Sequence, residues 1–420
     1  MTKDEISVAS KKDKFLNTLQ GHTSALQNDQ GLFSEATSAL ETLDFPTTRV
    51  EDWKYTRTTR ISNEQWQLVQ HAKSVNVEPF LIPDLDAHLI VFVDGVYNSH
   101  LSNVENAEFE LSLNKGFEQK NLVHKHIFTA LNVAYSTAAL CIRIRKNVVV
   151  SKPVHVLHIA STEKALAQAS LFFHAEQSSS LHIVESFVCE GDAKTLTNRL
   201  LNITVEENAH VHLDKIQMEG DNNFLVNEEN IYVASNGNFT INTLTVDGGW
   251  VRNGLNICLD GENIEANLNG FYLPRRKQHV DNHTLVDHRK PHSHSNELYK
   301  GILNDQGAGV FNGKVYVQMD AQKTNAFQSN ANVLLSDDAQ MNTKPELEIY
   351  ADDVKCSHGT STGQMDENAL FYLKARGIGD ENARKLLAAA FINDVVNKVE
   401  NEAVQQYVIN QLVDRGLLFV

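Results

Sequence analysis

Short runs of alternating apolar and polar residues fill the middle of the chain, from about Ala139 to Gly359. The run Val154-His-Val-Leu-His-Ile is an example, and many such runs follow a small polar turn such as Asn236-Gly-Asn. Alternation with a period of two places apolar side chains on one face of an extended strand, whereas a helix repeats them every three to four residues. The pattern therefore predicts short strands joined by tight turns.

The predicted strands recur at a nearly constant interval of roughly 25 to 31 residues, with one longer interval near 46. The strand starts behind this count are Leu181, Val211, Phe239, Ile264, Val310 and Met341. A fixed period in this range is typical of solenoids, whose coils stack around one continuous core. We therefore predict a mainly β fold of the β-helix type and interpret the long interval as an insertion at about residues 271–299. A sandwich or barrel with strands of similar length is the alternative.

Apolar residues recur at helical spacing near both ends of the chain. From about Phe15 to Leu43 they predict an N-terminal helical segment, which Pro46 ends. Three helices are predicted after Gly363, and Leu387, Phe391 and Val395 form an apolar stripe on the second of them. Such a stripe needs burial, either against the solenoid or against another protein.

These patterns divide the chain into three parts. Residues 1–85 are predicted to form a mainly helical segment, residues 86–363 the β-helix core and residues 364–420 a C-terminal helical domain. The core is expected to begin with a strand near Leu89, because Asp94-Gly95 follows it as a dipeptide that favours a hairpin turn.

The charge of the chain excludes some classes of partner. The formal net charge of −16 is not offset by a segregated basic patch, so binding to nucleic acid or to an anionic membrane is not expected. No apolar run is long enough to span a bilayer, and the first residues lack the composition of a secretion or transit signal, which predicts a cytoplasmic protein.

The usual catalytic motifs are missing from the sequence. The glycines from Gly307 to Gly313 fit neither the dinucleotide fingerprint nor the phosphate loop, whose lysine is followed by a hydroxyl residue, while here Val315 follows Lys314. Neither G-x-S-x-G nor a catalytic-cysteine signature is present. The chain is therefore not expected to be an ATPase or a hydrolase.

Histidines concentrate in one region, and imidazole is a common ligand of zinc, iron and copper. They are His279, His283, His288, His292 and His294. His279 and His283 are the candidate ligands, although neighbouring residues such as Val280 and Thr284 indicate extended structure rather than a shared helix face. A β-helical metal-binding enzyme that uses residues 279–294 is the alternative function. The other interpretation is a set of polar residues that line a surface of the solenoid.

The sequence Cys356-Ser357-His358 is a sharper candidate. Alternate residues of a strand share a face, so the cysteine thiolate would lie beside the imidazole, and both are ligands of iron. One cysteine and one histidine cannot complete the four ligands of a cluster, so a site here needs ligands from another chain. The other cysteines, Cys141, Cys189 and Cys258, are far apart, and no C-x-x-C motif predicts a disulfide framework or a zinc ribbon.

The block Lys344-Pro-Glu-Leu-Glu-Ile-Tyr-Ala-Asp-Asp-Val-Lys-Cys-Ser-His-Gly359 closely resembles the hallmark of SufD-type members of the SufB/SufD family. Further matching blocks are Glu51-Asp-Trp-Lys-Tyr-Thr56, His279-Val-Asp-Asn-His-Thr-Leu-Val-Asp-His288, Glu297-Leu-Tyr-Lys-Gly301, Gly309-Val-Phe-Asn-Gly-Lys-Val315 and Lys323-Thr-Asn-Ala-Phe-Gln-Ser-Asn-Ala331. SufB-type members fit less well, since they are longer, richer in cysteine and carry a glutamate-containing motif where this chain has Lys355-Cys-Ser-His-Gly. The chain departs from the SufD-type pattern at Val50 and Thr360, neither of which touches the candidate ligands.

The resemblance implies a right-handed parallel β-helix that acts as a non-catalytic scaffold in the Suf iron–sulfur cluster assembly complex. Implied partners are a SufB-like sister scaffold and a SufC-like ATPase. We expect the stripe of Leu387, Phe391 and Val395 to bind the ATPase. The alternative role for these helices is to cap the last coil. No stably bound cofactor is implied, but transient iron or a cluster at the partner interface would involve Cys356 and His358. In isolation the chain is expected to form a homodimer or to behave poorly.

Overall fold

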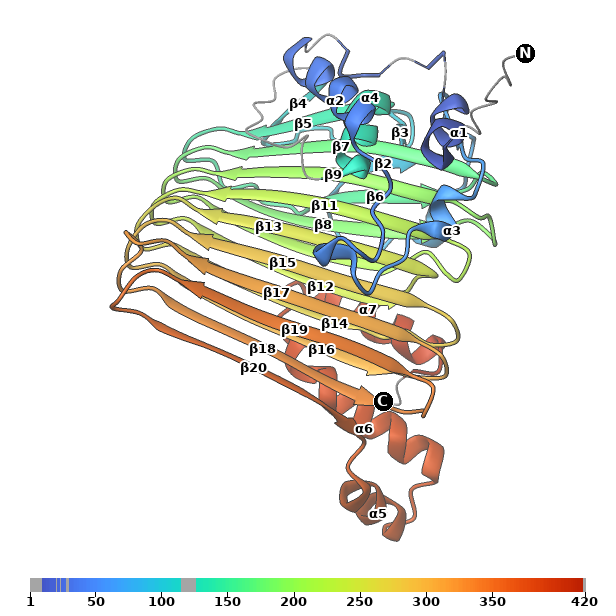
Figure 1. Ribbon diagram of the computed structural model, residues 1–420, viewed down its shortest axis with the longest axis vertical. Helices are drawn as coiled ribbons and strands as arrows, with labels where there is room; N and C mark the ends of the chain where they lie inside the picture. The colour runs from blue at the N-terminus through green and yellow to red at the C-terminus, as the bar shows by residue number, and fades with distance from the viewer. Residues whose placement is uncertain (1–9, 20, 23, 28–29, 115–125, 418–420) are drawn as a thin grey trace, which may run out of the picture.

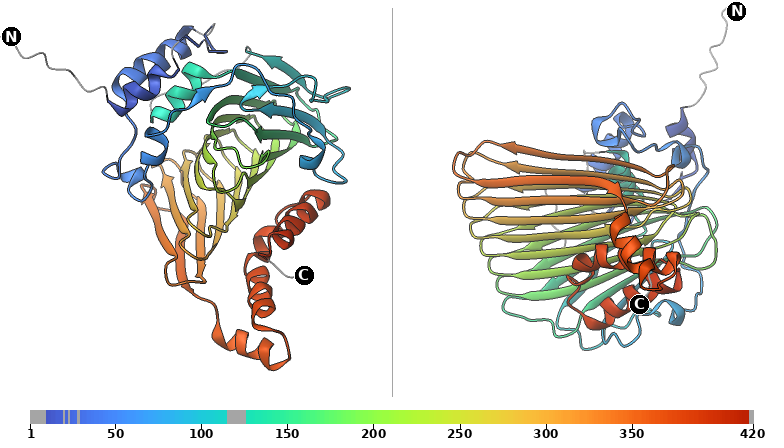
Figure 2. Two further views of the ribbon diagram at one scale, coloured as in Figure 1. Left: turned by 90° about the vertical axis from the view of Figure 1, so that its right-hand side faces the viewer. Right: turned by 90° about the horizontal axis from the view of Figure 1, so that it is seen from below.

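The middle of the chain coils between two facing β-sheets of ten strands each (Figure 1, Figure 2). The computed structural model describes residues 10–19, 21–22, 24–27, 30–114 and 126–417, so residues 1–9 and 418–420 of the predicted terminal segments lie outside it. The chain alternates between the sheets, and strands two apart in sequence pair in parallel. The result is a parallel β-solenoid of about eight turns with helices at both ends of the chain, which confirms the predicted fold class.

Sheet A has the order β19-β17-β15-β13-β11-β9-β7-β5-β4, with β1 paired to β7. Its strands are β1 (Gln67–Leu68), β4 (Glu110–Leu113), β5 (Ala138–Ile144), β7 (Ala165–Ala175), β9 (Leu196–Val205), β11 (Phe224–Val233), β13 (Trp250–Leu259), β15 (His279–His288), β17 (Ala308–Val317) and β19 (Gln340–Ile349).

Sheet B has the order β20-β18-β16-β14-β12-β10-β8-β6-β2-β3. Its strands are β2 (His88–Val93), β3 (Val96–Tyr97), β6 (Val154–Ala160), β8 (Ser180–Cys189), β10 (His210–Met218), β12 (Asn238–Asp247), β14 (Glu265–Tyr272), β16 (His294–Leu303), β18 (Asn325–Leu334) and β20 (Lys355–Gln364).

The predicted insertion at residues 271–299 is wrong. This segment holds β15, which pairs with β13 and β17 as a regular strand of sheet A, and the start of β16 in sheet B. The long interval in the sequence arose because Ile264 precedes a strand of sheet B whereas Val310 lies in a strand of sheet A. Both strands of a coil show the same alternation, so the pattern alone does not separate the two sheets.

From β7 to β18, one residue adopts the left-handed backbone conformation at each corner where the chain passes from sheet A to sheet B. These residues, with φ between 57° and 63°, are Ser178, Asn208, Asn236, Asn263, His292 and Lys323. Asparagine tolerates this conformation better than most residues, which explains the polar turns that recur in the sequence. The corners stack through backbone hydrogen bonds, for example from the Asn236 amide to the Glu262 carbonyl (2.8 Å).

The helices lie outside the solenoid. They are α1 (Lys11–Asn17), α2 (Gln30–Thr42), α3 (Thr59–Ser62), α4 (Ile127–Tyr135), α5 (Glu367–Ala375), α6 (Asp380–Val396) and α7 (Glu402–Asp414), with 3-10 turns at Glu51–Trp53 and Glu78–Phe80. The predicted N-terminal helical segment contains two helices, α1 and α2, and the three predicted C-terminal helices are α5, α6 and α7. Among the described helices, none is both long and apolar enough to cross a membrane.

Apolar side chains gather in three main regions. Inward residues of both sheets, such as Leu213 and Ile231, fill the space between the sheets. Residues of α1, α2 and α4, including Phe128, cover the outer face of sheet A. Residues of α6 and α7, including Ile392 and Val408, cover the outer face of sheet B. The two outer faces are thus covered by opposite ends of the chain (Figure 2).

Candidate functional site

The two ends of the solenoid differ. At the first coils, β3 and β4 add antiparallel strands to the sheets, and α4 packs against β7 and β9. At the last coil, β19 pairs only with β17 and β20 pairs only with β18 among the described strands, so each has one open edge. We call this the open end of the solenoid, defined by β19 and β20.

Cys356 and His358 both lie on β20, the outermost strand at the open end. The register places Cys356 opposite Ala326 and His358 opposite Gln328 of β18. Ala326 and Gln328 are buried, so Cys356 and His358 belong to the inward face of the strand, as the alternation predicts. At about 3.3 Å per residue, their Cα atoms are roughly 7 Å apart. The side chains share a face but are held on a strand whose outer edge is open.

Cys356 is half-buried against an apolar cluster that includes Val315 and Ala326. Burial raises the pKa of its thiol, although a hydrogen bond from the Ala326 backbone opposes this effect. The thiol is therefore protonated at neutral pH in the chain alone. Binding of iron would displace that proton, because the thiolate is the metal ligand.

His358 is exposed, and hydroxyl side chains continue its face of the strand. The hydroxyl groups of Thr360 on β20 and Thr343 on β19 are 3.0 Å apart, so the inward faces of the two outermost strands meet here. The open end therefore presents a thiol, an imidazole and several hydroxyl groups on one surface.

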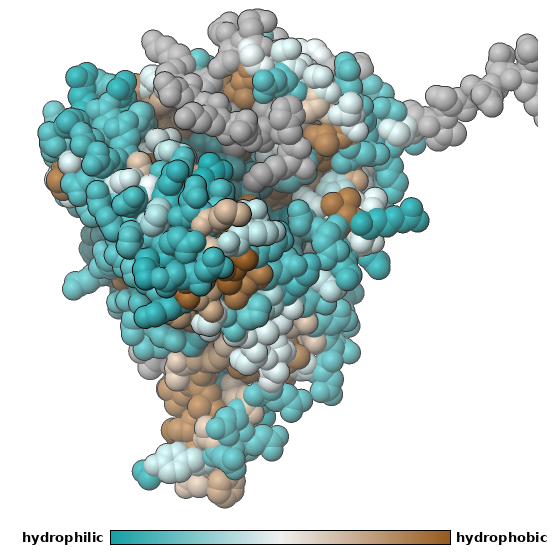
Figure 3. Space-filling model, turned by 60° about the vertical axis from the view of Figure 1, so that its left-hand side comes forward, coloured by the Kyte–Doolittle hydropathy of each residue, from teal (hydrophilic) through white to brown (hydrophobic). Residues whose placement is uncertain are grey.

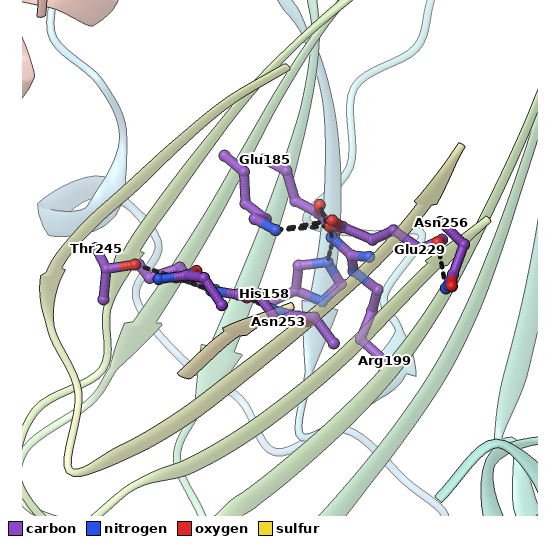
Figure 4. A network of polar contacts seen from close by, with 11 residues as sticks. His158, Glu185, Arg199, Glu229, Thr245, Asn253 and Asn256 are labelled. Carbon is purple, nitrogen blue, oxygen red and sulfur yellow. Dashed lines mark hydrogen bonds and ion pairs between the residues drawn. The ribbon is translucent and has the colours of Figure 1, made fainter. Parts of the chain in front are cut away.

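A network of charged side chains is buried between the sheets several coils away from the open end (Figure 4). The Lys215 ammonium group donates to both oxygens of Glu229 (2.8 and 2.9 Å), and Arg199 donates to Glu229 (2.8 Å) and to Glu185. His158 Nε2 lies 2.9 Å from Glu185 Oε1. The four charged side chains are at most 1% exposed, so two cations and two anions balance one another without solvent.

The pKa values in this network follow from burial and pairing. Burial alone would raise the pKa of Glu185, but Arg199 and the hydrogen bond with His158 outweigh it and lower that pKa to about 2. Burial lowers the pKa of Lys215 and of His158, so the imidazole is neutral at pH 7. Charged residues at the inward positions of otherwise alternating strands are the pattern in the sequence that could have identified this network.

Polar side chains continue from this network to the open end. They include Gln217, Asn253 and Asn282, then Glu297 with Gln328, then Tyr272, Asn330, Asn332 and Thr362. Glu297 is the buried acid of this column, and burial raises its pKa to about 7. The interior of the solenoid is therefore polar on one side along several coils, up to the strand that carries Cys356 and His358.

His279 and His283 lie on the outer face of sheet A, two residues either side of Asp281. His279 Nε2 is 3.0 Å from the Thr56 hydroxyl, and its ring stacks on Trp250. His283 Nε2 lies 3.1 Å from Asp281, which also pairs with the Arg252 guanidinium. A cation already neutralises the carboxylate between the two histidines, so this arrangement does not favour a metal ion.

The other histidines of this region diverge. His288 points into the core and lies 2.9 Å from the Ser295 hydroxyl, His292 forms a corner, and His294 is exposed on β16. The structure thus distributes the five histidines over four environments and does not assemble them into one site.

The stripe on α6 is largely used inside the molecule. Val395 is fully buried in the core between α6 and sheet B, while Leu387 and Phe391 are half-buried and line a cleft with Met365. The Lys300 ammonium group lies over the Phe391 ring (4.8 Å) and donates to the Phe391 carbonyl (2.7 Å). Val395 is therefore not accessible to a partner while α6 is packed on the solenoid.

A more exposed apolar surface, which was not predicted from the sequence, lies on α5. Phe371 and Tyr372 are 74% and 55% exposed on this short helix. Apolar surface gathers at the lower end of the molecule in Figure 3, where α5 lies in Figure 1. Two adjacent aromatic residues on one short helix were the signal that could have identified it.

Comparison with known proteins agrees with these features. Residues 158–391 match the family "SUF system FeS cluster assembly, SufBD core domain", and residues 13–156 match the "SufBD protein N-terminal region". The iron–sulfur cluster assembly protein SufD of Escherichia coli is 29% identical over 376 residues, 88% of this chain and 89% of its own length. SufD of Bacillus subtilis is 27% identical over 301 residues, 69% of this chain and 66% of its own.

A SufBD family protein of Synechocystis is 26% identical over 396 residues, with 88% of this chain and 87% of its own length covered. The core-domain match alone spans more than half of the 420 residues. Together with the solenoid and the open last coil, this match shows that the chain belongs to the SufBD family of the SUF iron–sulfur cluster assembly system.

Proposed function

We propose that this chain is a non-catalytic scaffold subunit that pairs with a SufB-like sister through the open end of its solenoid and contributes Cys356 and His358 to cluster assembly at that interface. The observation that carries the proposal is the open edge of β20, on the strand that holds both residues.

The two open edges are not equivalent. The Gln340 amide donates to the carbonyl of Gly307, just before β17 (3.0 Å), so by alternation the backbone of Pro345 faces the open edge of β19, where it offers no N–H. The Lys355 amide donates to the carbonyl of Thr324, just before β18 (2.9 Å), so the amides of Cys356, His358 and Thr360 face the open edge of β20. Because β20 contains no proline, it is the better edge for adding a strand from another chain.

Strand addition at β20 would place Cys356 and His358 beside the partner. Their thiolate and imidazole would supply part of a ligand set for iron or a nascent cluster, and the partner would supply the rest. Iron and cluster are cargo in this proposal, so the chain itself holds no permanent cofactor.

The C-terminal helices are proposed to bind a SufC-like ATPase. Phe371 and Tyr372 of α5 are the exposed apolar residues of this region, and the accessible side of α6 adds Leu387 and Phe391. Val395 would contribute only indirectly, by fixing α6 on sheet B.

Thr360→Pro tests the pairing. Because the Thr360 amide faces the open edge, the substitution should leave the chain's own sheet intact, while it removes an outward N–H and adds a ring at the edge. On coexpression with the SufB-like and SufC-like proteins, we expect at least ten-fold lower recovery of the sister, and native recovery with Thr360→Val. The native chain alone should self-associate in ultracentrifugation through the same edge. Native recovery of the sister with Thr360→Pro would contradict pairing through β20.

Cys356→Ser and His358→Ala test the ligand role. Both variant complexes should assemble at native yield, but anaerobically purified complexes should contain less iron and sulfide per complex. Cys258→Ser is the matched control, since Cys258 is a half-buried cysteine on β13, away from the open end. Native iron and sulfide content in both the Cys356 and His358 variants would show that the ligands lie elsewhere.

A further inference from the structure

Three potential metal ligands meet on the outer face of sheet B, away from the open end. They are His182 of β8 and His212 and Asp214 of β10. One ligand atom from each lies within 4.8 Å of the other two, and among the described residues this is the group of three that reaches such proximity.

The strand register creates this group. His212 is paired directly with His182 in adjacent parallel strands, and Asp214 lies two residues further on the same face. His182 Nε2 is 2.8 Å from Asp214 Oδ2, and His212 Nε2 is 3.1 Å from Asp214 Oδ1. Side chains that project from paired strands are held rigidly, which favours a defined coordination geometry.

The distances suit a transition-metal ion. A tetrahedral zinc ion with bonds of about 2.0–2.1 Å separates its ligand atoms by about 3.3 Å. The two nitrogen-to-oxygen separations are close to this value, and both Nε2 atoms already point at the carboxylate. Two imidazoles and one carboxylate leave a further coordination position open, and this ligand set is typical of zinc and ferrous iron.

The surroundings provide an outer shell. Asn242 donates to Asp214 Oδ1 (2.7 Å) and to the Lys398 carbonyl (3.1 Å) in the connector between α6 and α7. Glu400 of the same connector lies 3.8 Å from His212 Nδ1, the ring nitrogen that faces away from Asp214. This separation is that of an ion pair and not of a hydrogen bond; metal-binding histidines commonly have a carboxylate beside their second nitrogen.

We propose that His182, His212 and Asp214 bind one divalent ion of the zinc or ferrous type, and that this ion fastens the connector between α6 and α7 to sheet B. The site is separate from the cluster-assembly site: five strand spacings of about 4.8 Å place β10 about 24 Å from β20. The competing explanation is an ion-pair cluster that binds no metal.

Cobalt titration of the full chain separates the two explanations. After removal of metal with a chelator, the native chain should bind one Co²⁺ with visible d–d absorption, and Zn²⁺ should displace it. His182→Ala and His212→Ala should each weaken binding at least ten-fold, a loss expected even for outer-shell changes. His210→Ala, two residues before His212 on the same strand and exposed, should bind Co²⁺ like the native chain.

Further measurements separate a loss of metal binding from a loss of folding and from an effect on the proposed cluster ligands. Bound Zn²⁺ should slow amide hydrogen exchange in α7 of the native chain but not of the His182→Ala variant. His182→Asn, which keeps a polar side chain, should show the same loss of binding if His182→Ala folds poorly. Cys356→Ser should retain Co²⁺ binding, which separates this site from the proposed cluster ligands. Absence of Co²⁺ binding in the native chain, or equal binding by the His182, His212 and His210 variants, would overturn the proposal.

Discussion

Glu229→Gln should destabilise the solenoid strongly, because it removes the carboxylate that both Lys215 and Arg199 use. Arg199 retains Glu185, but the Lys215 ammonium group loses the partner that accepts both of its hydrogen bonds. Breaking a buried ion pair by removing one partner costs about 3–5 kcal/mol. The cost of the unpaired Lys215 charge has an upper limit, because the lysine can lose its proton instead. Neutralising a lysine with an ordinary pKa near 10.4 costs about 4.6 kcal/mol at pH 7.

The stability of the Glu229→Gln variant should rise with pH. In the variant, Lys215 is neutral when folded and charged when unfolded, so the unfolded state binds the extra proton and stability rises with pH. At pH 9 the deprotonation cost falls to about 1.9 kcal/mol. The destabilisation should therefore shrink by more than half between pH 7 and pH 9.

Adding Lys215→Met to Glu229→Gln restores charge balance and should recover most of the lost stability. We expect a coupling energy of several kcal/mol in the double-mutant cycle, outside the range of independent sites. Glu262→Gln, an exposed carboxylate in a corner of the solenoid, is the control and should change stability by no more than about 0.5 kcal/mol.

Equilibrium urea unfolding followed by circular dichroism measures these values. Hydrogen exchange in β9 and β11 should accompany it, because stacked coils need not unfold as one unit. A loss below about 1 kcal/mol for Glu229→Gln at pH 7, or an equal loss in the double variant, would refute the account of a charge-balanced network.

Two further predictions concern Glu219 and α5. Burial raises the pKa of Glu219 to about 8 despite a hydrogen bond from Thr197, so the acid is neutral when folded and ionised when unfolded, and it lowers stability as pH rises from about 4.5 to 8. Glu219→Gln should thus raise the melting temperature more at pH 8 than at pH 5; an equal effect at both values would contradict a buried neutral acid. Phe371→Ser with Tyr372→Ser on α5 should reduce recovery of the SufC-like ATPase at least ten-fold without changing the melting temperature, whereas native recovery would place the docking surface elsewhere.

The fold was largely predictable because its signals are local. Alternation marks strands, and polar corner residues such as Asn236 mark turns that need a left-handed backbone. The assignment of strands to sheets was not local: Ile264 and Val310 begin similar runs but belong to different sheets, which produced the false insertion. A count that paired every second strand would have corrected it, since the register aligns Ala266 with Ser295.

The candidate sites were also predictable only where their signals are local in the sequence. That Cys356 and His358 share a face followed from alternation, but nothing in the sequence placed them on an open edge. The α6 stripe predicted burial correctly and could not say what buries Val395. His182 and His212 are thirty residues apart and form no motif, yet each follows a predicted strand start, Leu181 and Val211, which are paired in the sheet. Register converts such separated residues into neighbours.

The open end stays uncovered although three helices follow it in the sequence. The chain continues beyond β20 with three helices, and α6 lies against β14 and β16 on the outer face of sheet B rather than across the edges of β19 and β20 (Figure 2). Open edges favour aggregation, and stacked-coil proteins usually cap their terminal coils. Since β3 and β4 pair with the edge strands of the first coils, the exposed last coil is consistent with an edge that another chain covers. The C-terminal helices leave α5 free, where Phe371 and Tyr372 face solvent, so the proposed pairing and the proposed ATPase binding would use separate surfaces of the same C-terminal region.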